Sequence, residues 1–228
     1  EDLNPEMGYF IPYAAFTDDG RLMAQIYVTD MREIHLTTGE MSGNLNELAD
    51  LLFRAGCGGD DVFMLTMTGG SYHHDGETTA LPDVLKAQID AALEADFGNT
   101  PKIVFWKNSD GYLFFTTHTG LYSYIPGGSV TEELIGGTRT SLGDPTCIPT
   151  ALTGTGDGSF YLLCQLNQQP TLCHFTYDED APVVADTQLR IYSLYPDDDL
   201  TQMVSQFQKA NQDITVEMEI GLSGEDGM

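Results

Sequence analysis

The sequence predicts a mainly β fold, with β-propeller-like antiparallel blades, two inserted helices, and a short C-terminal βαβ segment. Three observations predict it: an Asp-Gly turn that recurs between short apolar strands, the roughly even spacing of these turns, and the loss of the repeat near residue 182. We therefore expect two domains: a propeller-like β-repeat domain over residues 1–182, and the truncated start of a solute-binding α/β domain over residues 187–228.

The repeat consists of an Asp-Gly turn, a short apolar strand, a second turn and a strand with aromatic or aliphatic residues. Its three clear copies are Thr17–Glu40, Asn108–Gly128 and Thr155–Asp180. An Asp-Gly pair between strands is typical of a hairpin, because glycine adopts the positive φ that tight turns need.

The spacing of the turn glycines indicates the number of blades. Gly111 and Gly158 are 47 positions apart, and Gly20 lies 91 positions before Gly111, close to twice that spacing. A weaker copy fills the gap at Gly58–Gly70, with Asp61 in the turn position. Repeats of roughly 40–50 residues with several short strands are typical of propeller blades, so we expect about four.

Two helices are predicted between the strands. Asn44 is a candidate cap for the first, with Glu47 at the capping-box position and Gly56 placed to end it. The second is expected over Asp83–Ala95. The apolar residues at helical spacing are Leu45, Leu48, Leu52 and Ala55 in the first helix and Leu85, Ile89, Ala92 and Leu93 in the second.

These helices leave a second interpretation open. Strands over residues 22–28, 62–67 and 103–106, with the two helices between them, would form a parallel βαβαβ unit. A hydrolase, either a glycosidase or protease-like, would then become a candidate function. The later Asp-Gly segments would remain unexplained.

The pattern changes after Ala181–Asp186, which is expected to be a linker. A strand is predicted over Leu189–Tyr195, a helix capped by Asp198 or Asp199, and a half-buried strand over Ile214–Ile220. The helix is expected to bury a stripe formed by Leu200, Met203, Val204, Phe207 and Ala210. Strand, helix and strand at this spacing predict a right-handed βαβ unit.

Residues 187–228 resemble the opening of an extracellular solute-binding domain of bacterial ABC importers of the carbohydrate-uptake type. The residues that carry this resemblance are Ile191–Leu194, Phe207–Lys209, Asn211, Gly221 and Ser223–Gly227. The upstream region resembles the segment that precedes this domain in a class of surface lipoproteins. The matching residues there are Thr119–Tyr122, Gly127–Val130, Ser141–Pro145, Asp157–Phe160 and Thr176–Asp178.

The resemblance implies an extracellular location, a lipid anchor on a cysteine upstream of Glu1, and a propeller-like region in front of the binding domain. It also implies oligosaccharide or a membrane importer as partners of the parent protein. A solute-binding domain holds its ligand between two lobes, and only the first two strands of lobe one are present. Sugar binding in that cleft is therefore not expected of these 228 residues alone.

The charge excludes several other partners. The net charge is −26, from 35 acidic against 9 basic residues, so the surface repels phosphate backbones and anionic membranes. No apolar run approaches the roughly 20 residues that span a bilayer, so direct membrane insertion is not expected. The composition thus disfavours a nucleic-acid-binding protein.

No catalytic residue, metal ligand or cofactor site is predicted, and no ligand-binding residue is identified. The sequence lacks the GxSxG, HExxH and P-loop patterns. His73-His74-Asp75 is interpreted as a solvated loop, and Asp197-Asp198-Asp199 as a helix cap. Trp106, Tyr112 and Tyr122 are interpreted as core rather than as a sugar platform.

The sequence therefore predicts a non-catalytic extracellular binding or interaction module, with a hydrolase and a structural spacer as the alternatives. Four cysteines are present without a CxxC pair, so neither a zinc site nor a thioredoxin-like site is signalled. Cys164 and Cys173 flank a predicted hairpin. A disulfide and a pair of buried thiols both remain open there.

Overall fold

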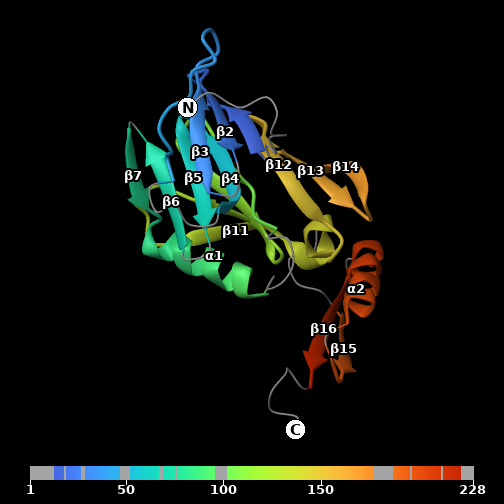
Figure 1. The fold of residues 1–228 in the computed structure, drawn as a ribbon. Coiled ribbons are helices and arrows are strands. Elements are labelled where there is room, and N and C mark those ends of the chain that lie inside the picture. Colours follow the sequence, from blue (N-terminus) through green and yellow to red (C-terminus); the bar gives the residue numbers. More distant parts are fainter. Residues whose placement is uncertain are drawn as a thin grey trace. The chain divides into compact units, whose positions relative to one another are not determined.

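The computed structural model describes residues 13–17, 19–26, 29–46, 52–66, 69–74, 76–95, 102–176, 187–195, 197–211 and 213–221. Within these residues, four antiparallel sheets, which we name A to D, follow one another along the chain, and a parallel two-stranded sheet follows them (Figure 1). The mainly β, propeller-like fold class is confirmed. The predicted domain boundary between residues 182 and 187 falls mostly outside the described residues and stays a prediction.

The chain divides into two compact units. The first comprises residues 1–97, 103–115 and 123–132, and the second comprises residues 98–102, 116–122 and 133–228. No helix among the described residues is both long enough and apolar enough to cross a bilayer.

The first unit begins with sheets A and B, each an up-and-down meander. Sheet A contains β1 (Tyr13–Phe16), β2 (Leu22–Ile26) and β3 (Asp30–Ile34). Sheet B contains β4 (Leu52–Gly58), β5 (Asp61–Thr66), β6 (Gly69–His74) and β7 (Glu77–Ala80). Helix α1 (Asp83–Ala95) follows β7 and lies across the end of sheet B (Figure 1). It buries Leu85, Ile89 and Ala92, so the second predicted helix is confirmed.

Sheets C and D repeat the meander. Sheet C contains β8 (Phe105–Lys107), β9 (Leu113–Thr117), β10 (Gly120–Tyr124) and β11 (Thr131–Gly136). The single-turn 3₁₀ helices η1 (Gly137–Arg139) and η2 (Ser141–Gly143) lead into sheet D. Sheet D contains β12 (Ile148–Gly154), β13 (Phe160–Leu166) and β14 (Gln169–Phe175).

The Asp-Gly repeat corresponds to one turn in three of the sheets. Gly20, Gly111 and Gly158 have φ values of 85°, 87° and 84°, and each joins the first two strands of its sheet. In each turn the glycine N–H donates to the carbonyl three residues earlier, that of Thr17, Asn108 or Thr155. In sheet B the corresponding turn has Gly59, with φ 61°, in the left-handed position, while Asp61 begins β5.

Two sequence interpretations are wrong. The proposed parallel βαβαβ unit does not form, because its three strands fall in sheets A, B and C, which are antiparallel. The helix expected from Asn44 is also wrong over its described residues, because residues 44–46 are loop and residues 52–55 belong to β4, while residues 47–51 lie outside the described part of the chain. The Asn44 side chain accepts from the N–H groups of Met31 and Asn46, so it closes the loop after sheet A.

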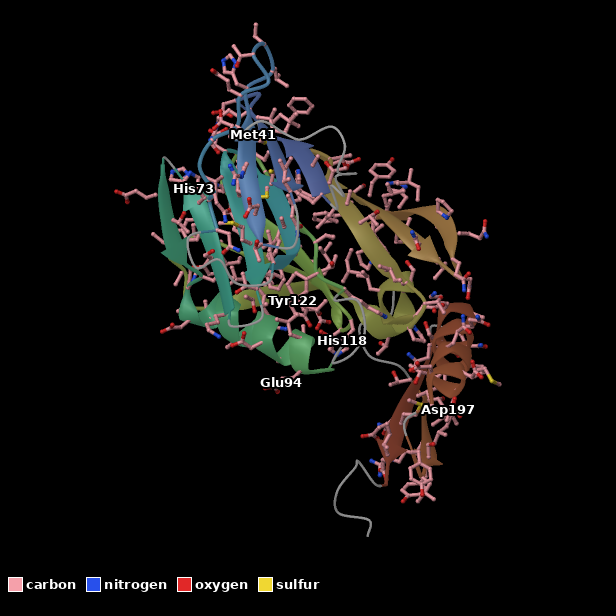
Figure 2. All side chains as sticks on the ribbon, in the orientation of Figure 1. Met41, His73, Glu94, His118, Tyr122 and Asp197 are labelled. Carbon is pink, nitrogen blue, oxygen red and sulfur yellow. The ribbon has the colours of Figure 1, made fainter. Side chains whose placement is uncertain are left out.

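The C-terminal segment is a βαβ unit, as predicted. β15 (Thr187–Ser193) pairs in parallel with β16 (Ile214–Ile220), and α2 (Asp198–Ala210) connects them. The predicted cap at Asp198 or Asp199 is wrong, because both residues already lie in the first turn of α2. The cap is Asp197, labelled in Figure 2, which accepts from the N–H of Leu200 at 3.0 Å.

The expected apolar face of α2 is wrong in part. Met203 is 66% exposed and Phe207 is 39% exposed, whereas Ser205 and Gln208 are buried. The Gln208 amide donates to the carbonyl of Thr138 at 2.8 Å and accepts from the N–H of Val216 at 2.6 Å. These two hydrogen bonds turn the Gln208 side of the helix toward η1 and β16. Met203 and Phe207 of the predicted apolar stripe are therefore left partly exposed.

Candidate functional site

The first unit contains a pocket of about 210 Å³ between sheet B and the part of sheet C that belongs to the same unit. We call it the groove. Its walls are mainly apolar and aromatic, with three ionisable residues among them. The lining residues are Asp61, Phe63, Tyr72, His74, Leu81, Pro82, Leu85, Lys107, Leu113, Tyr124, Pro126 and Gly127.

The pairing of the strands brings the groove residues together as two neighbouring sets, one aromatic and one polar. Phe63 pairs with Tyr72 across β5 and β6, and Phe105 on β8 packs against Phe63. We call these three the aromatic rung. Because side chains two residues apart on a strand share a face, Asp61 and His74 lie next to this rung, on its groove side.

Two glycines of β4 allow β8 to approach. Gly56 pairs with Phe63 and Gly58 with Asp61, so both glycines belong to the same face. A Cβ at Gly56 would lie 3.3 Å from Phe105 Cβ, and one at Gly58 would lie 2.7 Å from Lys107 Cβ and 2.8 Å from its backbone nitrogen. All three distances are shorter than an ordinary van der Waals contact. Glycine is therefore what lets Lys107 reach the edge of sheet B.

Asp61, His74 and Lys107 form a hydrogen-bonded polar cluster at one end of the groove, which we call the polar rung. Lys107 Nζ donates to Asp61 Oδ2 at 2.6 Å, and His74 Nδ1 is hydrogen-bonded to Asp61 Oδ1. The Asp61 side chain is 9% exposed, that of Lys107 is 19% and that of His74 is 48%. A buried carboxylate needs such partners, because an unpaired buried charge is strongly destabilising.

Phe63 and Tyr72 of the aromatic rung line the groove, and Phe105 supports Phe63 from outside the lining. The Phe63 and Phe105 rings stack with centroids 4.9 Å apart, and those of Phe63 and Tyr72 lie 6.2 Å apart. On the sheet C side, the Tyr124 hydroxyl accepts from the N–H of Gly127 at 3.2 Å. That contact holds the loop that lines the groove.

The structure changes the interpretation of the His73-His74 pair. Both residues lie on β6 rather than in a solvated loop, because β6 continues to His74 in register with β7. His73 is buried, and its Nδ1 atom lies 3.0 Å from the Thr78 hydroxyl. Asp75 lies outside the described residues. His74 thus joins a site that the sequence did not predict.

The three aromatic residues considered as a sugar platform lie in different surroundings. Trp106 packs against Phe114, with ring centroids 5.1 Å apart. Tyr122 is buried, and its hydroxyl donates to Glu133 at 3.1 Å, while burial raises the pKa of that hydroxyl (Figure 2). Tyr112 is 39% exposed. The core interpretation therefore holds for Tyr122 and not for Tyr112.

The predicted hairpin around Cys164 and Cys173 is confirmed, with Asn167 and Gln168 at positive φ in its turn. The two thiols are free and lie diagonally across β13 and β14, with their sulfur atoms 3.9 Å apart. Burial raises the pKa of Cys164 and of the neighbouring Cys147. Among the described residues, no three His, Cys, Asp or Glu side chains are arranged to hold a metal ion.

No protein-family model and no curated protein matches the chain. Virginiamycin B lyase from Staphylococcus aureus is similar in structure at 15% identity and a TM-score of 0.42, over 74% of this chain and 56% of that one. YCF48 bound to D1 peptide is similar at 13% identity and a TM-score of 0.44, over 72% and 50%. The extracellular domain of the hybrid two-component system BT3049 from B. thetaiotaomicron is similar at 12% identity and a TM-score of 0.42, over 69% and 19%.

The chain thus spans between about a fifth and about three fifths of the length of these structures. The likeness is distant and confined to β-rich architecture.

Proposed function

We propose that the chain is a non-catalytic extracellular binding module that takes a small solute in the groove between sheets B and C. The observation that carries this proposal is the polar rung at the end of an aromatic-walled pocket. Small-molecule sites are typically concave and mostly apolar, with a few polar groups that fix the orientation of the ligand. The groove has each of these properties.

An NMR titration tests this proposal. A panel of monosaccharides, amino acids and monocyclic carboxylates is added to ¹⁵N-labelled protein, and the amide shifts of Phe63, Tyr72 and Tyr124 are followed. A saturable shift of these amides, with Leu162 of sheet D unmoved, supports the proposal. Tyr72→Ala should weaken the binding, whereas Tyr112→Ala removes a half-exposed tyrosine outside the groove and should leave it unchanged. No saturable shift with any compound would favour the structural spacer.

The hydrogen bond between Asp61 and His74 favours a second candidate, an acid–base catalyst. A carboxylate that orients an imidazole is a common part of such sites. Among the described residues of the groove lining there is no serine, threonine or cysteine to act as a nucleophile, which supports the binding module instead. Incubating each compound that binds with an equimolar amount of protein distinguishes the binding module from the catalyst. Recovery of unchanged ligand supports binding, and a conversion that His74→Ala abolishes supports catalysis.

The same proposal extends to the parent protein, for which we propose a lipid-anchored surface protein that serves carbohydrate uptake through an importer. The resemblance of residues 187–228 to a solute-binding domain supports this. The βαβ unit formed by β15, α2 and β16 is compatible with it. Calorimetric titration with oligosaccharides tests this extension in a protein that continues past residue 228. The extension predicts that the longer protein binds an oligosaccharide that the 228-residue chain alone does not bind.

A further inference from the structure

We infer that the solute held in the groove is a small ring-bearing carboxylate, an inference that rests on the proposed binding function. Two sources share this chemistry: an aromatic acid such as phenylacetate and a sugar acid such as glucuronate. The size of the groove, its walls and its polar end each contribute to the inference.

The size of the groove limits the ligand to about one ring. Pockets for drug-sized ligands have volumes of about 300–1,000 Å³, and the groove has about 210 Å³. Its walls suit the faces of a ring, because Phe63, Tyr72 and Tyr124 present aromatic surface and Leu81 and Leu113 present aliphatic surface.

The polar end favours a ligand that accepts hydrogen bonds. Asp61 is the only carboxylate among the described residues of the lining, and both of its oxygens already have a partner in Lys107 and His74. The Lys107 ammonium has three N–H groups, and Asp61 Oδ2 accepts one of them. Donors therefore exceed acceptors at this end, and a ligand carboxylate supplies acceptors with the charge opposite to that of Lys107.

The acidity of the whole chain does not reverse this preference. The net charge of −26 repels anions at long range. At about 0.15 M salt, however, charges more than roughly 8 Å apart are largely screened. Among the described residues of the lining, the charge of the one carboxylate, Asp61, is offset by the one ammonium, Lys107, so the groove adds no net repulsion of its own.

Matched ligands at 0.15 M NaCl test the inference on the unmodified chain. The dissociation constants of phenylacetate, phenylacetamide, glucuronate and glucose are measured from the shifts of Phe63, Tyr72 and Tyr124. Each acid should bind about tenfold or more tightly than its neutral counterpart, because hydrogen bonds between charged groups are about twice as strong as neutral ones. The stronger of the two acids identifies the source, and the apolar walls favour phenylacetate.

Variants then locate the carboxylate. Lys107→Met keeps the aliphatic stem and should weaken binding of the acid about tenfold or more, whereas Lys107→Arg should retain it. Lys86→Met is the control, because Lys86 is also paired with an aspartate, Asp90, but lies outside the lining. If Lys107→Met unfolds, Asp61→Asn combined with Lys107→Met removes the uncompensated buried charge and permits the measurement.

The results separate the inference from the proposed function. If acids and their neutral counterparts bind with equal affinity, or if Lys107→Met leaves binding unchanged, the inference of a carboxylate ligand is wrong, whereas the proposed binding function is still supported. If no compound of any class shifts the groove amides, both fail. Acid-selective binding that Lys107→Met abolishes supports both.

Discussion

Gly58→Ala is the substitution that most directly tests the packing of β4 against β8. The added Cβ would lie 2.7 Å from Lys107 Cβ and 2.8 Å from Lys107 N. Neither atom belongs to a flexible chain end, so relief requires the β8 backbone to move. Forcing an extra carbon into a packed site costs about 1–3 kcal/mol. Because backbone must move, we expect a loss near the upper end, about 2–3 kcal/mol.

Two further glycines provide a graded comparison. At Gly56 the new carbon would meet Phe105 at 3.3 Å, so Gly56→Ala should cost about 1 kcal/mol. At Gly43 no atom lies within 4 Å, and the backbone is not left-handed. Gly43→Ala should therefore stabilise the protein by about 0.4–1 kcal/mol, because alanine reduces the entropy of the unfolded chain.

Urea unfolding followed by circular dichroism measures the three free energies. The expected order of stability is Gly43→Ala, then the unmodified chain, then Gly56→Ala, then Gly58→Ala. The melting temperature of Gly58→Ala should fall by roughly 4–12 °C for a chain of this size. If Gly58→Ala unfolds at the same urea concentration as Gly43→Ala, β8 does not lie against β4 as described. The placement of Lys107 in the groove would then be refuted too.

Two other predictions concern buried polar groups. Gln208→Ala removes the hydrogen-bond partner of Thr138 O and of Val216 N, so hydrogen exchange of the Val216 amide should accelerate roughly 30-fold. The control is Gln206→Ala, at an exposed position of the same helix, which should leave that exchange rate unchanged. Burial raises the pKa of Cys57 from 9.0 to about 11. As pH rises, the Cys57 thiol of the unfolded chain therefore ionises at a lower pH than that of the folded chain. The free energy of unfolding should fall between pH 9 and 11 by up to about 2–3 kcal/mol. Urea midpoints at pH 8, 9 and 10 measure it, and a slope that persists in Cys57→Ala would contradict the assignment.

The repeat could be predicted from the sequence because it depends on local chemistry. An Asp-Gly turn needs positive φ at glycine, and that requirement is visible in the residues themselves. Gly20, Gly111 and Gly158 satisfy it, and each joins the first two strands of a sheet. The helix α1 and the C-terminal βαβ unit were likewise visible as periodic apolar positions.

The segment around Gly56 was misread because two signals compete there. Leu52 and Ala55 have helical spacing, and Asn44 fits a cap, yet Gly56 and Gly58 alternate at the period of a strand. Glycines at that period indicate close approach by another backbone, which here is β8. This alternation was the sequence signal that could have pointed to a strand and to its neighbour.

The polar rung could not be predicted, because it joins residues from three strands. Asp61 begins β5, His74 ends β6 and Lys107 ends β8, and only the register of two sheets brings them together. In a chain with 35 acidic residues, one aspartate beside a turn carries no signal of its own. His74 was visible as part of a histidine pair, but its partner was 13 positions away.

The glycine pair and the polar rung together explain why the groove lies between sheets B and C. In β4, the absence of side chains at positions 56 and 58 lets β8 lie directly against the sheet. Phe105 then stacks on Phe63, and Lys107, two residues further on the same face, reaches Asp61. The charge at the end of the groove is thus a consequence of how closely the two strands pack. A ligand held by Lys107 would depend on the same contact that stabilises the fold, so selectivity for its carboxylate should be lost with that contact.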